Sequence, residues 1–437
     1  MAPPPKVPPV LPDSTVPDAS APGSPARRRF VRALAAGGIA LPALPALGAP
    51  GPSSRQPVGP AADAPSREAS RDAAEGAAGR ARHLVLVELQ GGNDGLNTLV
   101  PYADPVYRTL RPTLAHPRDA VLPLDERVGL HPALAPLMPL WGRGELAVVE
   151  GVGYPEPNRS HFRSIEIWET ASGADEVRED GWLAPLARTL LGGTPGTIGA
   201  VALADDEGPL AGATAESVVL EDVERFVRQA TRLEARELAA TNPTLAHVLE
   251  VERTVRRAAL EFSRRLEASL ADRAAPADGP PLVRRLDAIA RLIAEDAGPR
   301  LWKVGLGSFD THVNQLGRHA RLMGELAAGI AHFEAALVAA GRWGDVALAT
   351  YSEFGRRAAE NGSGGTDHGT AAPHLVAGGA VRGGLHGAPA GLDRLEGGDL
   401  AFTTDFRALY ASLAGGWLGQ RPGGMPWAGF GRLPLFG

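Results

Sequence analysis

The stretch HLVLVELQGGNDGLN, residues 83–97, determines the expected fold of this chain. Its first eight residues are almost continuously apolar, and a glycine-rich turn follows them directly. Such a run predicts a strand buried on both faces, which is typical of a parallel sheet covered by helices. The turn places Asp94 at the tip of this strand. An ordinary turn, in which Asp94 caps the next helix, is the alternative.

Five more apolar runs of this kind occur downstream, at 146–152, 197–204, 301–307, 345–351 and 373–378. Helical patterns lie between them, so we expect an α/β fold with a doubly wound, mostly parallel sheet. The segment 216–297 differs, because it is almost wholly helical in pattern and rich in Arg and Glu. We expect it to form a helical insertion in the domain, with a solvated charged face.

The composition narrows the classes of function. The chain has 437 residues, of which 44% are hydrophobic and 22% charged, as in a globular protein. Its net charge is −6 and no basic stripe carries interleaved aromatic residues, so no nucleic-acid partner is expected. The sequence contains no cysteine, which excludes disulfides, thiolate metal ligands and a lipid-modified cysteine. Any metal must be held by oxygen and imidazole ligands.

The first eighty residues have the features of an export signal and a tether. The sequence RRRFVR at 27–32 fits a twin-arginine pattern, and a short, weakly apolar stretch with small residues follows at 33–49. That stretch is too short and too broken by proline to span a membrane. We therefore expect a signal at 1–49 read by the twin-arginine export machinery, a disordered linker at 50–80 and a folded domain at 81–437. The mature protein would be periplasmic or otherwise exported, without a stable membrane anchor. An Arg-rich tail that only resembles a signal is the alternative.

Acidic and imidazole side chains follow several of the predicted strands, at the edge where ligands bind in open parallel sheets. Asp310 and His312 come just after the run 301–307. A carboxylate and an imidazole together are a typical ligand pair for a divalent metal ion. The alternative is that His312 is an ordinary surface residue of a loop.

The densest polar cluster follows the run 345–351. It contains Glu353 and Arg356, and then Asp367 and His368 between glycines directly before the run 373–378. Two strand ends would lie side by side here, so we predict a site that includes these residues. The alternative is a loop whose polar residues only keep it soluble. It does not explain why an Asp-His pair stands between glycines directly before a buried strand.

Ser160 follows the run 146–152 and would open a helix. A serine in this place is usually an N-cap, which is the simpler interpretation. The functional interpretation makes Ser160 a nucleophile or metal ligand that is activated by a cation.

Several motifs together resemble, in order, the landmarks of the DUF1501 family over about residues 82–420. They are LQGGNDGLN at 89–97, RSHF at 159–162, FDTH at 309–312, SEFGR at 352–356 and GTDHG at 365–369. A twin-arginine leader is common in that family. The family is similar to the alkaline phosphatase and sulfatase superfamily, so the resemblance implies an alkaline-phosphatase-like fold.

The resemblance also implies a two-metal, phosphatase-type arrangement of residues. Ser160 would take the position of the nucleophile. The implied metal ligands are Asp94 on the first strand, Asp310 and His312, Glu353 at a strand end, and His368. We expect Asp367, directly before His368, to be a metal ligand as well. Phe354 stands where the superfamily has a histidine, so one imidazole ligand is missing.

Two functions follow from these observations. The first is an exported hydrolase that acts on a phosphate or sulfate ester, in a small molecule or a polymer, with a divalent ion (Zn, Ca, Mg or Mn). In it, Asn93 and Arg356 would stabilise the anionic transition state. The second is a non-catalytic binding or assembly protein on the same scaffold, which the Phe354 departure favours. A metal-free esterase has less support, because no Gly-x-Ser-x-Gly motif surrounds Ser160.

Overall fold

The computed structural model describes most of the chain after residue 79. The described residues are 80–190, 198–213, 217–223, 225–226, 253, 256–257, 259–260, 262–264, 279–296, 298–421 and 423–437. The expected export signal at 1–49 and all but the last residue of the expected linker lie outside this part. So does most of the expected helical insertion. These three expectations stay predictions.

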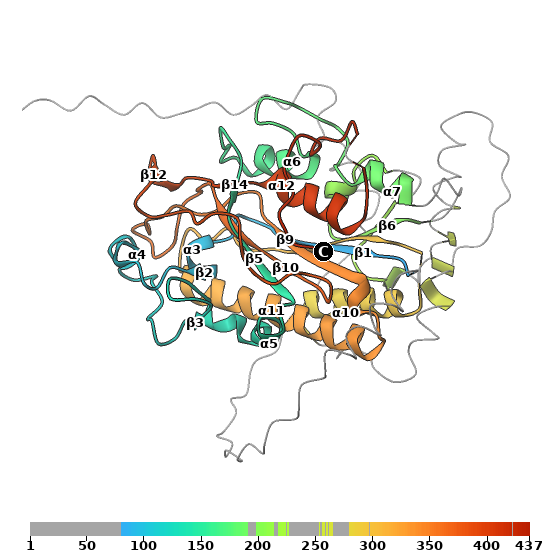
Figure 1. Cartoon of the computed structure of the whole chain (residues 1–437), viewed down its shortest axis with the longest axis horizontal. Coiled ribbons are helices and arrows are strands. Elements are labelled where there is room, and N and C mark those ends of the chain that lie inside the picture. Colours follow the sequence, from blue (N-terminus) through green and yellow to red (C-terminus); the bar gives the residue numbers. More distant parts are fainter. Residues whose placement is uncertain are drawn as a thin grey trace, which may run out of the picture. The chain divides into compact units, whose positions relative to one another are not determined.

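One large sheet forms the centre of the described part (Figure 1). Its strands are β1 (His83–Leu89), β5 (Leu146–Gly153), β6 (Ala200–Leu203), β7 (Ser217–Leu220), β8 (Leu301–Leu306), β9 (Val346–Tyr351), β10 (Ala372–Ala377), β11 (Gly384–His386) and β14 (Thr404–Asp405). The order is β11-β5-β10-β9-β1-β8-β6-β7, and β14 also pairs with β5. All of these pairings are parallel except those of β10, which is antiparallel to both β5 and β9. The predicted mixed α/β fold with a mostly parallel sheet is confirmed.

Two details differ from the expectation. The sixth predicted strand, β10, runs against its neighbours, because no helix crosses over between β9 and β10. A parallel return needs such a crossover, and the chain instead turns back through an irregular loop. The second difference is β7, which lies inside the segment expected to be helical. Two of its four residues are valines, and β-branched side chains suit an extended edge strand.

Helices cover both faces of the sheet. They are α3 (Gly95–Thr98), α4 (Pro105–Leu110), α5 (Met138–Arg143), α6 (His161–Thr170), α7 (Ala184–Leu190), α10 (Pro281–Ala294), α11 (Gln315–Ala339) and α12 (Phe406–Ala411). Short 3-10 helices occur at Pro132–Leu137, Gly208–Leu210 and Trp343–Asp345, and a π-helical turn at Ser412–Trp417. Small strand pairs involve β2 (Leu99–Val100), β3 (Leu122–Pro123), β4 (Gly129–Leu130), β12 (Leu395–Glu396) and β13 (Asp399–Leu400).

The buried side chains of the sheet divide alternately between two cores. In β1, Val85 and Val87 face the core that contains α10 and α11, while Leu84 and Leu86 face the core that contains α6, α7 and α12. Figure 1 shows these two helical layers on opposite sides of the strands. This alternation explains why the strands read as continuous apolar runs. The buried side chains of α10 belong to the first of these cores. This helix, which lies in the segment 216–297, is therefore part of a layer that covers the sheet.

Helix α11 is long and apolar enough to cross a membrane by length and composition alone. Its apolar side chains, including Leu322, Ile330 and Phe333, are buried against α10 and the sheet. It is therefore a core helix of this domain.

The turn after β1 fixes the loops at the carboxyl edge of the sheet. Gly91 has a φ of 111°, and a Cβ there would lie 2.4 Å from the backbone nitrogen of Asp310. Only glycine allows this approach of two loops. The loop after β1 and the loop after β8 therefore meet at the place where the polar side chains gather.

Candidate metal centre

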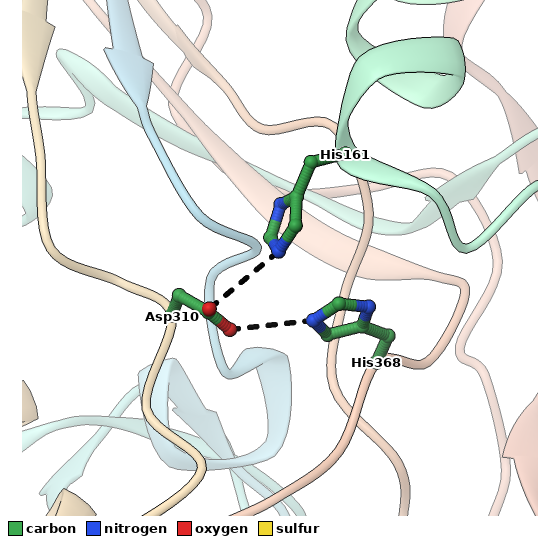
Figure 2. A group of neighbouring side chains, drawn as sticks. All are labelled: His161, Asp310 and His368. Atoms are coloured by element: carbon green, nitrogen blue, oxygen red, sulfur yellow. Dashed lines mark hydrogen bonds and ion pairs between the residues drawn. The ribbon is translucent and has the colours of Figure 1, made fainter. Parts of the chain in front are cut away.

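Side chains from three separate segments converge at the carboxyl edge of the sheet. His161 is the first residue of α6, Asp310 follows β8, and His368 lies in the loop between β9 and β10. One ligand atom from each of the three lies within 4.8 Å of the other two. Figure 2 shows both imidazoles pointing at the Asp310 carboxylate. His312, two residues after Asp310, joins this group.

The ligand atoms of Asp310, His312 and His368 form a small triangle. Asp310 Oδ1 lies 3.1 Å from His312 Nε2 and 3.3 Å from His368 Nε2. The two Nε2 atoms are 3.0 Å apart. Ligand atoms about 2.0–2.1 Å from a tetrahedral zinc ion are about 3.3 Å from one another. The triangle therefore has nearly the spacing of three ligands around one ion.

The hydrogen bonds of the Nδ1 atoms of His312 and His368 determine which nitrogen of each ring carries the proton. His368 Nδ1 lies 2.8 Å from the carbonyl oxygen of Arg159, which can only accept a hydrogen bond. His312 Nδ1 lies 3.0 Å from Asp367 Oδ1. Each neutral imidazole therefore carries its proton on Nδ1 and a lone pair on Nε2. Metal-binding histidines typically donate their second nitrogen to a carboxylate or a carbonyl in this way.

Two lone pairs 3.0 Å apart repel each other unless something positive lies between them. Either one imidazole takes up a second proton or a cation binds both. Burial lowers the pKa of His368, which disfavours the extra proton on that ring. The arrangement is therefore better suited to a cation than to a pair of imidazoles without one.

His161 stands beside the triangle and is held by Glu353. Its Nδ1 lies 2.9 Å from Glu353 Oε1, and its Nε2 lies 3.6 Å from Asp310 Oδ2. The hydrogen bond that His161 donates to Glu353 raises the pKa of His161 above its usual value. Glu353 also accepts the Gly91 N–H at 2.8 Å and is nearly buried. Glu353, which we expected to be a metal ligand, contacts His161 and the turn after β1 instead.

Asp367 and Phe354 both contact histidines of the cluster. Asp367, another expected ligand, is exposed and accepts hydrogen bonds from His312 and Asn361. These hydrogen bonds, from Asn361 first, lower the pKa of Asp367. The Phe354 ring packs against His161 and His368, with ring centroids 4.9 and 4.6 Å away. Asp367 therefore orients an imidazole, and Phe354 fills the space beside two of them.

Arg356 connects the loops of the cluster. It is buried and lies 2.6 Å from Asp310 Oδ1. Burial alone would raise the pKa of Asp310, but the hydrogen bond and charge of Arg356 outweigh it and lower that pKa. The guanidinium also donates to four backbone carbonyls, of Gly91, Gly92, Phe309 and Thr366. The expected role of Arg356 toward an anionic substrate gains no support from this geometry, because its donors are used within the protein.

The structure does not bring Asp94 or Asn93 into the cluster. Asp94 is fully buried and forms an ion pair with Arg111 at 2.6 Å. Burial would raise the pKa of Asp94, but Arg111 outweighs that effect and lowers it. The Asn93 carboxamide is buried too, and its oxygen lies 3.1 Å from His319 Nε2. The expected roles of Asp94 as a ligand and Asn93 as a transition-state donor therefore have no geometric support.

Ser160 occupies the N-cap position of α6, but its side chain makes no capping hydrogen bond. The residue is exposed and directly precedes His161. The simpler interpretation, in which Ser160 serves only to cap the helix, therefore lacks the capping hydrogen bond that it requires. The hydroxyl is open to solvent at the end of the helix that carries His161.

His161 is the functional candidate that the sequence analysis did not select. It lies in the RSHF motif next to Ser160, and Ser160 drew attention as the possible nucleophile. The signal available was its place at a helix start just beyond a buried strand. Its partners Asp310 and Glu353 lie far along the chain, so no local spacing revealed it.

A second group of acidic side chains could resemble a metal site by distance alone. Glu88, Glu169 and Asp206 each place one oxygen within 4.8 Å of the others. Lys303 lies among them, with its Nζ 2.8 Å from Glu88, 3.7 Å from Glu169 and in contact with Asp206. We call these four residues the lysine cluster. An ammonium group already supplies the positive charge here.

The fold and the cluster define an α/β protein with an imidazole-rich, metal-site-like centre at the carboxyl edge of a mostly parallel sheet. The family model described as "Protein of unknown function (DUF1501)" matches residues 136–394. The chain belongs to this family, which confirms the resemblance seen in the sequence. No curated protein matches the chain in sequence.

Several solved structures are similar to the chain at a low level. "Crystal structure of Ps i-CgsB" has 9% identity and a TM-score of 0.36, covering 80% of this chain and 75% of that one. The lipoteichoic acid synthase LtaP from Listeria monocytogenes has 11% identity and a TM-score of 0.29, covering 70% of each chain. PH0037 protein from Pyrococcus horikoshii has 12% identity and a TM-score of 0.30, covering 69% and 89%. At these values the likeness does not extend to function.

Proposed function

We propose that this protein is a hydrolase of phosphate or sulfate esters that uses one divalent metal ion, on an alkaline-phosphatase-like plan. The observation that carries the proposal is the triangle of Asp310 Oδ1, His312 Nε2 and His368 Nε2, with sides of 3.0–3.3 Å. Three protein ligands and one open position are typical of catalytic zinc sites. The three side chains are partly exposed, which leaves such a position open to solvent.

The donor set fits a borderline ion such as zinc, because it combines two imidazoles with one carboxylate. A bound ion of this kind polarises an ester oxygen and lowers the pKa of a hydroxyl or water. Arg356 holds the Asp310 carboxylate ionised, and Asp367 and the Arg159 carbonyl hold the two imidazoles in the tautomer that leaves Nε2 free. These residues prepare the site before an ion arrives.

His161 is the best placed group for moving a proton. Glu353 keeps a proton on Nδ1 and raises the pKa of the ring, so the imidazolium form can donate from Nε2 to a leaving-group oxygen. Ser160, exposed and directly before His161, is the proposed nucleophile. The proposal therefore keeps Ser160 from the sequence analysis and adds His161 as the acid.

The direct test combines metal analysis with hydrolysis by the full-length protein, purified without chelators. We expect about one zinc or similar ion per chain, and hydrolysis of p-nitrophenyl phosphate or p-nitrophenyl sulfate. His161→Ala should lower kcat by about 10²–10⁴-fold while the metal content stays the same. Asp310→Asn should lose the metal. Asp393→Asn, a change at an exposed carboxylate that is not part of the cluster, serves as the control. Absence of metal from the unchanged protein would refute the proposal.

A second candidate is a metal-binding protein without catalysis, which serves in binding or assembly. The packing of Phe354 against His161 and His368 favours it, because an aromatic ring fills the place where an imidazole is expected. This candidate predicts stoichiometric metal without turnover of either ester. The same measurements therefore separate the two functions.

We also propose that the chain is exported through the twin-arginine pathway, on the pattern RRRFVR at 27–32. The test is the substitution of Arg27, Arg28 and Arg29 by lysine, followed by fractionation of cells. Retention of the variant in the cytoplasm supports export by this route. Equal export of the variant and the unchanged chain contradicts it.

A further inference from the structure

A cavity lies outside the candidate metal centre. It has a volume of about 320 Å³, and none of the residues of the metal-centre triangle lines it. Most of its wall is apolar; contributing residues include Leu96, Leu99, Ala372, Pro373, Leu392 and Leu400. A volume of a few hundred cubic ångströms is the size at which small-molecule sites begin. The cavity is thus large enough for a compact ligand with an apolar body.

One buried carboxylate interrupts this apolar wall. Glu150 lies in the middle of β5, where its neighbours from Leu146 to Val149 are apolar. It is 5% exposed, and no hydrogen bond or ion pair joins its carboxylate to any other described residue. An ionised group in such surroundings is costly unless it is paired. Its carboxylate therefore borders the cavity without a partner among the described residues.

The backbone is shaped to present Glu150 at this point. Val149 pairs with His374 and Val152 pairs with Ala372, so two residues of β5, Glu150 and Gly151, lie opposite one residue of β10. Such a bulge redirects a side chain out of the regular alternation. Gly151 has a φ of 60°, and a Cβ there would lie 1.9 Å from Thr403 Oγ1, so the bulge requires glycine. The position of Glu150 is therefore built into the strand.

The charges around the cavity do not neutralise Glu150. Arg127 lines the wall, but its guanidinium pairs with Asp125 at 2.8 Å. Asp104 also lines the wall, and its carboxylate accepts the Val106 N–H at 2.8 Å. Burial raises the pKa of Glu150, as does the charge of Asp125, while Arg127 opposes this. The wall therefore carries two carboxylates against one guanidinium that is already paired.

We propose that this cavity binds a small organic ammonium ion, whose N–H groups bond to Glu150 and whose apolar part fills the space between Leu96 and Leu392. A charge-assisted hydrogen bond to a carboxylate is among the strongest that a protein makes. The same carboxylate excludes organic anions. A metal ion does not fit, because a single carboxylate in an apolar wall offers too few ligands. The site is independent of the proposed hydrolase activity.

The test uses three probes of equal chain length with the full-length protein: hexylammonium, hexanol and hexanoate. Calorimetry or ligand-observed NMR should show that hexylammonium binds at least about tenfold more tightly than hexanol, because a hydrogen bond to a charged group is worth that factor. Hexanoate should not bind. Glu150→Gln, which keeps the shape of the side chain, should abolish the preference for hexylammonium over hexanol.

Two controls make the result decisive. Glu396→Gln removes an exposed carboxylate that does not line the cavity, and should leave the preference unchanged. Leu392→Trp should weaken both hexylammonium and hexanol by filling the cavity. Equal affinities for the two probes, a preference that survives Glu150→Gln, or the absence of binding by all three probes would each overturn the proposal.

Discussion

The candidate metal centre and the lysine cluster both gather side chains that could bind a metal ion, but their surroundings differ. Both bring together three potential ligands whose atoms lie within 4.8 Å of one another. In the lysine cluster the carboxylates surround the fully buried Lys303. In the candidate metal centre Arg356 contacts the carboxylate of Asp310, but the lone pairs on His312 Nε2 and His368 Nε2 have no positive charge between them.

The comparison shows that proximity of acidic side chains does not by itself indicate a metal site. In the lysine cluster, burial would lower the pKa of Lys303, but the charges of Glu88, Glu169 and Asp206 outweigh it and raise that pKa. The cluster therefore favours the charged form of its own lysine. The metal centre is open to solvent and has no such resident charge between its ligands. The position of the positive charge separates a structural cluster from a binding site.

The largest expected effect is at the lysine cluster. Lys303→Met should destabilise the protein by about 3–5 kcal/mol, because it leaves buried carboxylates without their cation. Arg143→Met is a matched control, since it removes a cation from the exposed pair with Glu334 and should cost less than about 1 kcal/mol. Unfolding in urea measures both. A Lys303→Met change as small as the control would contradict the account of the buried cluster.

The next largest effect concerns the metal centre. Zinc at about 100 times its Kd should raise the free energy of unfolding by about 2.7 kcal/mol. His312→Gln and His368→Gln should each remove most of this gain, because each takes away one corner of the triangle. Arg143→Met should keep it. Thermal unfolding with and without zinc measures the effect, and stabilisation that survives both histidine changes would mean that zinc binds elsewhere.

A buried group without any counter-charge extends the comparison. Burial lowers the pKa of His374 to about 3, from 6.5 in the unfolded chain. Its contribution to stability is complete above pH 6.5 and decreases by about 1.4 kcal/mol per pH unit as the pH falls toward 3. His374→Leu should therefore reduce the slope of the unfolding free energy against pH between pH 6 and 4. The reduction should correspond to about one proton fewer taken up on unfolding. An unchanged slope in urea unfolding at several pH values would show that the ring is protonated in the folded protein.

The smallest expected effect is at Ser160. A capping serine is worth about 1 kcal/mol, but Ser160 makes no capping hydrogen bond, so Ser160→Ala should change the free energy of unfolding by less than about 0.5 kcal/mol. Urea unfolding gives this value, and hydrolysis assays on the same sample give the functional one. A loss of 1 kcal/mol or more would restore the capping interpretation.

The sequence was sufficient to predict six of the strands of the sheet and part of the candidate centre. Continuous apolar runs revealed β1, β5, β6, β8, β9 and β10, and the rule that ligands gather at strand ends pointed to Asp310, His312 and His368. The direction of β10 was not predictable, because it depends on the path of a loop. The same holds for the ring nitrogens: which atom of His161 faces Asp310 is decided by Glu353, a contact between distant segments.

Asp94 shows the opposite limit. Its place at the tip of β1 suggested a ligand, and that position is as expected. Its partner Arg111, seventeen residues later, decides its role by neutralising it in the interior. A strand-end position can therefore be predicted from the local sequence, whereas the charge that meets it cannot.

The bonds of Arg356 have an evolutionary consequence. The guanidinium donates hydrogen bonds to the backbone carbonyls of Gly91, Gly92, Phe309 and Thr366. Every amino acid has such a carbonyl. Apart from the two glycines, whose positions leave no room for a Cβ, the side chains of these loops can therefore change while the loop backbone keeps its place. Exchange of the other loop side chains around Arg356 would therefore change what the site binds without rebuilding the edge of the sheet.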